Sequence, residues 1–133
     1  MQKLVVSSFA LVAVLVSAGC PSIKELCQKE YDCQDELGVP LEDDYVAVCE
    51  TATQGQLQAL RKNAEQECED LAGAEEALAT CLLTLDCEQF AEYRSNPTSD
   101  SCKEARENRM AKFEAAEFGA KCDGRGTGEG EGE

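Results

Sequence analysis

The chain contains no histidine and no tryptophan, and only three of its 133 residues are proline. Histidine is the commonest general base and a frequent metal ligand, so its absence weakens the case for acid–base catalysis and for a zinc finger. None of the nine cysteines has the Cys-x-x-Cys spacing of thioredoxin-like redox motifs. We therefore predict no catalytic residue, no metal ligand, no cofactor and no enzymatic activity.

Positive charge is also scarce: the chain has 12 Lys and Arg residues and 27 Asp and Glu residues, for a net charge of −15. No basic cluster interrupts this excess, so we expect no nucleic-acid binding. The two densest acidic clusters, residues 42–44 and 67–70, lack the frame of a calcium-binding loop. We interpret them as helix-end charges and solvated surface, and a weak cation site remains the alternative.

The first twenty residues have the three parts of an export signal. Lys3 precedes an apolar run from Leu4 to Val16, and the small residues Ser17, Ala18 and Gly19 lead to Cys20. The run is shorter than the roughly 20 residues that cross a bilayer comfortably. We predict that residues 1–19 are a signal peptide and that Cys20 is lipidated.

The cysteine count supports this assignment. Nine is an odd number, and a lipid on Cys20 leaves eight cysteines, which suit four disulfides in an oxidising compartment. The expected disulfide cysteines are Cys27, Cys33, Cys49, Cys68, Cys81, Cys87, Cys102 and Cys122.

The eight cysteines form two sets of similar spacing, which indicates an internal repeat. Corresponding members lie 54, 54, 53 and 54 residues apart, and Asp32-Cys33 is echoed by Asp86-Cys87. We predict one domain over residues 20–122, with repeat one at about 22–72 and repeat two at about 73–122. The Gly- and Glu-rich tail, 123–133, has no apolar residue to bury, so we expect it to be disordered.

No segment alternates with period two, whereas apolar residues recur every three or four positions, which predicts an all-α fold. We expect about four helices, arranged as a disulfide-stapled up-down bundle of two duplicated hairpins. The second helix should run from Val46 past Cys68 to Leu71, with a bend or break near Gly55, and the third from Ala74 to Phe90. The other two should cover about 23–37 and 102–119.

Helix geometry constrains the disulfide pairing only in part. Cys33 and Cys49 should lie level across the first turn, and Cys87 and Cys102 across the second, so we predict these two bridges. The other four cysteines fall at the opposite end of the bundle. The nested option pairs Cys27 with Cys68 and Cys81 with Cys122, and the alternative pairs Cys68 with Cys81 and Cys27 with Cys122.

Ala18-Gly19-Cys20, followed by this cysteine series, resembles the small cysteine-rich lipoproteins of Gram-negative bacteria. Ser17 departs from the leucine that usually stands at its position. The resemblance implies a lipid anchor on Cys20 and, because Pro21 rather than Asp follows it, a location at the outer membrane. It implies no mechanism.

We therefore expect a non-catalytic envelope lipoprotein, held to the membrane through Cys20, that acts as a structural module or binds an envelope or extracellular protein. Tyr45, Tyr93 and Arg94 lie near the predicted turns and are the candidate binding surface, unless the tyrosines only close over the loops. The alternative is a small-ligand or cation carrier. We expect so short a bundle to pack without a cavity, and an apolar pocket above about 300 Å³ would favour the carrier.

Overall fold

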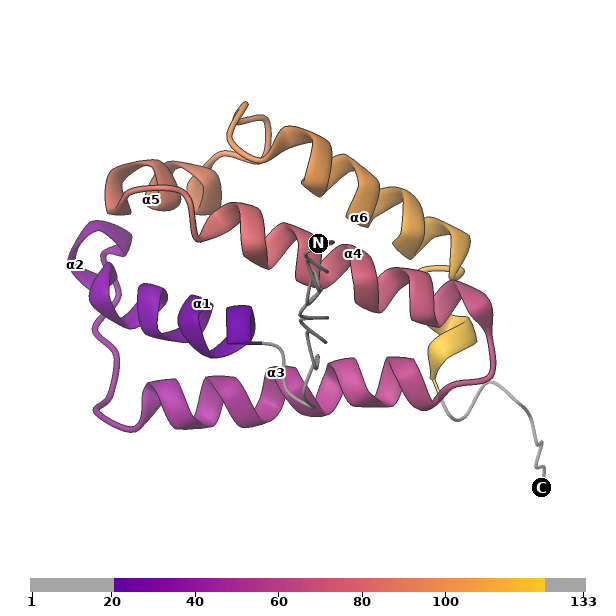
Figure 1. Cartoon of the computed structure of the whole chain (residues 1–133). Helices are drawn as coiled ribbons and strands as arrows, with labels where there is room; N and C mark the ends of the chain where they lie inside the picture. The colour runs from indigo at the N-terminus through magenta and orange to yellow at the C-terminus, as the bar shows by residue number, and fades with distance from the viewer. Residues whose placement is uncertain (1–20, 124–133) are drawn as a thin grey trace, which may run out of the picture.

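The computed structural model describes residues 21–123, which form an all-helical bundle with no strand in that range (Figure 1). The predicted signal peptide, Cys20 and tail residues 124–133 lie outside the described residues. The helices are α1 Pro21–Asp32, α2 Gln34–Leu37, α3 Tyr45–Lys62, α4 Gln66–Leu82, α5 Cys87–Ser95 and α6 Lys103–Ala115, followed by a 3₁₀ turn, η1, at Ala120–Cys122. The predicted fold class is thus confirmed.

Four long helices alternate in direction, and two short ones sit at one end of the bundle. In Figure 1, α1 and α4 run one way and α3 and α6 run the other, while α2 and α5 lie together at the left. Helix α1 packs against α3, α4 packs against α6, and α1 and α3 both contact α4. Helix α4 therefore lies at the centre of the bundle and carries much of the core.

The second and third helices begin and end elsewhere than predicted. Helix α3 continues through Gly55, so the expected bend there is wrong, and the chain breaks at Asn63 instead. The Asn63 side-chain oxygen accepts a hydrogen bond of 2.9 Å from the Glu65 backbone N–H, a local turn that competes with helix. Cys68 and Leu71 therefore belong to α4, a single helix that crosses the predicted boundary between the repeats.

A second missed boundary lies at Asp86, within the predicted third helix. The Asp86 side chain accepts a hydrogen bond from the Gln89 backbone N–H, and the Gln89 side chain accepts one from the Asp86 backbone N–H. This capping box satisfies two backbone donors and starts α5 immediately afterwards. The expected long helix ending at Phe90 is therefore two helices, α4 and α5.

All eight cysteines of the described residues form disulfides, but every predicted pairing is wrong. Neither the Cys33–Cys49 and Cys87–Cys102 bridges nor the nested or alternative set is present. The bridges are Cys27–Cys49, Cys33–Cys87, Cys68–Cys122 and Cys81–Cys102, with S–S distances of 2.01 to 2.11 Å.

The pairing follows from the connection between α1 and α3. That connection is not a tight turn, since α2 and a loop intervene, so Cys27 in the second half of α1 lies level with Cys49 in the first half of α3. Cys33 lies beyond the end of α1, beside the start of α5, and bonds Cys87 there.

Two apolar clusters form the core, one around Cys27 and the other around Phe90. The first contains Ile23, Cys27, Leu57, Ala72 and Ala79, and the second contains Cys33, Leu78, Leu82 and Phe90. Leu26 packs against both. The two clusters meet along α4, where the candidate site lies.

Candidate functional site

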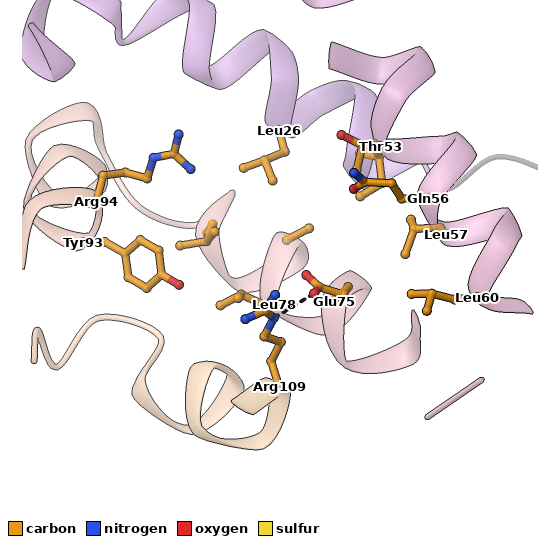
Figure 2. Close-up of a pocket in the computed structure, with 13 residues that line it drawn as sticks. Leu26, Thr53, Gln56, Leu57, Leu60, Glu75, Leu78, Tyr93, Arg94 and Arg109 are labelled. Atoms are coloured by element: carbon orange, nitrogen blue, oxygen red, sulfur yellow. Dashed lines mark hydrogen bonds and ion pairs between the residues drawn. The ribbon is translucent and has the colours of Figure 1, made fainter. Parts of the chain in front are cut away.

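A groove of about 360 Å³ opens where the two apolar clusters meet, so the expectation that the bundle packs without a cavity is wrong. We call it the main groove, and Figure 2 shows it. It is lined by Ile23, Leu26, Thr53, Gln56, Leu57, Leu60, Glu75, Leu78, Ala79, Leu82, Tyr93, Arg94 and Arg109. Its volume falls in the lower part of the range of ligand pockets, about 300 to 1,000 Å³.

Helix contacts explain why the main groove stays open. Helix α6 packs against α4 but has no buried side chain. On α4, the small side chain of Ala79 leaves space in the lining of the groove. The side chains that reach the opening from α5 and α6 are Tyr93, Arg94 and Arg109. Long polar side chains thus border the opening of the main groove.

An ion pair crosses one wall of the main groove. The Arg109 Nε donates to Glu75 Oε1 at 2.7 Å, and the Arg109 guanidinium lies 5.2 Å from the centre of the Phe113 ring. Both members of the pair are about one-third exposed. The ring and the carboxylate together hold the arginine in place.

A buried glutamate holds Arg94, one of the residues that line the main groove. Glu30 is 8% exposed. It accepts a hydrogen bond from the Tyr45 hydroxyl and forms an ion pair with Arg94, whose Nη1 lies 3.3 Å from Glu30 Oε1. These three residues come from α1, α3 and α5, so the cluster ties those helices together. It also lines a smaller cavity of about 190 Å³, which shares Arg94 with the main groove.

The environment of Tyr45 changes its acidity. Burial, the hydrogen bond to Glu30 and the negative charge of Glu30 together raise the pKa of Tyr45 from 10.0 to about 12, against a smaller opposing effect of Arg94. The folded protein therefore holds this proton more tightly than the unfolded chain does. The resulting stabilisation is fully present below pH 10 and is lost as the pH rises towards 12.

We expect Tyr45 to ionise near pH 12, a step that a Tyr45→Phe variant should lack. The measurement is phenolate absorbance during an alkaline titration, taken as the difference between wild type and variant. The matched variant Tyr31→Phe should keep the late step. A difference curve with its midpoint at pH 10 for Tyr45→Phe would show that the Glu30 hydrogen bond does not persist in solution.

At the far end of the bundle, the acidic segment 67–70 contacts η1 rather than forming an ion site. Lys121 donates to Glu67 Oε1 at 3.0 Å, beside the Cys68–Cys122 bridge. This contact lowers the pKa of Glu67 and raises the pKa of Lys121. Within residues 21–123, no group of three or more Cys, Asp or Glu side chains is placed to hold a metal ion.

The structure brings the three residues of the predicted binding surface close together. Arg94 contacts Glu30 beside Tyr45, and Tyr93 and Arg94 both line the main groove. Glu30, Glu75 and Arg109 were not among the predicted site residues. Each of them stands at helical spacing within an apolar stripe, for example Glu30 after Leu26 and Cys27, and a charged residue in such a stripe is a usable signal.

Comparison of the chain with protein-family models, with curated proteins and with solved structures found no match. The site is therefore interpreted from its own geometry. None of the helices in residues 21–123 is long and apolar enough to cross a membrane.

Proposed function

We propose that the chain is an exported lipoprotein, processed after Gly19 and anchored through a lipid on Cys20. The observation that carries this proposal is the complete pairing of the eight other cysteines, which leaves Cys20 without a partner in the framework. Four disulfides in one small domain fit an oxidising compartment. The proposed location is the outer membrane of a Gram-negative bacterium.

We expect a Cys20→Ala variant to lose its membrane anchor or to accumulate as an unprocessed precursor, because no thiol remains at position 20 to accept the lipid. The measurement is fractionation of cells followed by gel mobility. The control is Ser17→Leu, which restores the residue usual at that position in the resembled lipoproteins and should keep the protein in the membrane fraction. Unchanged fractionation and mobility of Cys20→Ala would contradict the anchor.

At the membrane, the proposed role is that of a non-catalytic module. Two versions of this role are supported by different observations. A structural or protein-binding module is supported by the rigid, bridged framework and by exposed apolar side chains such as Val48 at 58% and Phe118 at 68%. A small-ligand carrier is supported by the main groove, whose volume of about 360 Å³ exceeds the lower limit of about 300 Å³ for ligand pockets.

The main groove favours the carrier. Seven of its thirteen lining residues are aliphatic and the other six carry polar or charged groups, a mixture that suits an amphipathic small ligand. Binding of a small apolar ligand to the purified domain, measured by calorimetry, is the test. A protein-binding module instead predicts that a tagged lipoprotein co-purifies with one envelope protein and that Val48→Asp abolishes this association.

We also propose that the domain arose by duplication of a unit of about 54 residues. Cys33–Cys87 and Cys68–Cys122 each join cysteines 54 residues apart, and Cys27–Cys49 and Cys81–Cys102 have separations of 22 and 21. When a residue bonds its own counterpart in a twofold arrangement, both lie close to the axis. The two 54-residue bridges thus fit an approximate twofold axis between the units, and a different pairing in solution would remove this support.

A further inference from the structure

Leucine side chains make up much of the floor of the main groove. Helices α1, α3 and α4 each contribute to it, with Leu26 above, Leu57 and Leu60 on one side and Leu78 below in Figure 2. The Glu75 carboxylate lies beside Leu78 in the same view, where Arg109 pairs with it. An unbranched hydrocarbon chain is the ligand part that the leucine floor fits, since it gains from leaving water without needing a hydrogen bond.

Hydrogen-bond donors also line the main groove, beside these leucines. In Figure 2, Tyr93 and Arg94 extend from α5 towards Leu26 and Leu78, and Arg109 extends from α6 to meet Glu75. Arg109 uses its Nε for Glu75, and no group of the described residues hydrogen-bonds its two terminal nitrogens. Arginine has five N–H donors, so a fork of donors faces the opening.

Arginines are concentrated at the main groove of an acidic chain, although Arg94 pairs with Glu30 and Arg109 pairs with Glu75. The net charge is −15, yet the lining contains two arginines and one carboxylate, Glu75. Arg106 adds a third guanidinium, 5.8 Å from the ring of the groove residue Tyr93, and its Nη1 is buried with no hydrogen-bond partner in the described residues.

We propose that the main groove binds an amphipathic carboxylate of the fatty-acid class, with the alkyl chain on the leucine floor and the carboxylate between Arg94 and Arg109. A guanidinium binds a carboxylate through paired, charge-assisted hydrogen bonds. The proposal rests on the carrier function above and names its ligand class.

The test is calorimetric titration of oxidised protein, residues 21–133, with decanoate, decanol and decylammonium at moderate salt, which screens the acidic surface. Decanoate should bind once per chain and about tenfold or more tightly than decanol, because decanol lacks the charge-assisted contact. Decylammonium should not saturate a single site. Chemical shift changes should fall on the methyl groups of Leu26, Leu57 and Leu78.

Three variants test whether Arg109 itself binds the carboxylate, as opposed to a general effect of charge on affinity. Arg109→Gln should weaken decanoate about tenfold and leave decanol unchanged. Glu75→Gln should strengthen decanoate several-fold, because it removes the carboxylate that competes for Arg109. Arg61→Gln removes an arginine that pairs with Glu69 and Glu76 outside the groove, so it should change neither ligand. Thermal melting of each variant checks that the fold is intact.

The outcomes distinguish the ligand class from the function. If decanoate and decanol bind equally and Arg109→Gln changes neither, the carboxylate inference is overturned and the carrier stands. Binding of decylammonium more tightly than decanoate, with shift changes at the methyl groups of Leu26, Leu57 and Leu78, also overturns the carboxylate inference and leaves the carrier function standing. If none of the three compounds binds, both the inference and the carrier function are overturned.

Discussion

Reduction of the four disulfides is expected to unfold the domain. In the chain-entropy treatment, loops of 22 and 21 residues correspond to roughly 3 kcal/mol per bridge, and loops of 54 residues to about 4 kcal/mol. Their combined effect reaches the whole stability of an ordinary domain, about 5 to 15 kcal/mol. The excess of negative charge adds self-repulsion that the bridges oppose.

Far-UV circular dichroism with and without a reductant measures this effect. The oxidised protein should keep its helical signal on heating to a temperature at which the reduced protein has lost it. As a graded control, the paired variant Cys27→Ser with Cys49→Ser should cost about 1 kcal/mol less than Cys68→Ser with Cys122→Ser, because its loop is shorter. A reduced protein that melts within a few degrees of the oxidised one would contradict this role of the bridges.

Phe90→Ala is expected to be the most destabilising single core substitution, with a loss of about 3 to 5 kcal/mol in the free energy of unfolding. The Phe90 side chain is fully buried, and it packs with Cys33, Leu78 and Leu82 where α5 meets α4 and α1. Removing its ring leaves a cavity beside the Cys33–Cys87 bridge, which the covalent bond prevents from collapsing freely.

Denaturant titration of the oxidised protein measures this loss. Phe118→Ala is the matched control, because the same ring is removed from a side chain that is 68% exposed, and its effect should stay within about 0.5 kcal/mol. Similar losses for the two variants would mean that α5 does not anchor the second cluster.

The fold class was predictable from the sequence because it depends on features that the sequence displays directly. Apolar residues at steps of three and four specify helices, and an even cysteine set specifies bridges between them. The end of α2 was also visible, since Gly38 adopts the left-handed conformation that glycine favours after a helix.

The helix boundaries were harder to predict because two of them depend on single polar side chains. The apolar stripe from Val46 to Leu71 suggested one helix, whereas the turn at Asn63 divides it. The Asp86-x-x-Gln89 capping box stood in the sequence and was readable as a helix start. A shift of one boundary moved Cys68 from the end of one helix to the start of the next, and the disulfide pairing changed with it.

The main groove was not predictable because it depends on how five helices meet. Tyr93 and Arg94, which line the groove, and Tyr45, which lines the smaller cavity beside Arg94, could be selected as the polar residues near turns. Glu30 and Arg109 stand within apolar helical stripes, which indicates that they face the core but does not indicate which residue each one contacts. Their partners Tyr45 and Glu75 lie on other helices, and only the tertiary structure pairs them.

The most direct test of the central claim, a lipid-anchored domain held by four specific bridges, is non-reducing peptide mapping by mass spectrometry of the protein purified from its native envelope. We predict an acylated peptide that begins at Cys20 and four disulfide peptides. The bridges expected are Cys27–Cys49, Cys33–Cys87, Cys68–Cys122 and Cys81–Cys102. A Cys33–Cys49 peptide, or Cys20 found unmodified or within a bridge, would contradict the account.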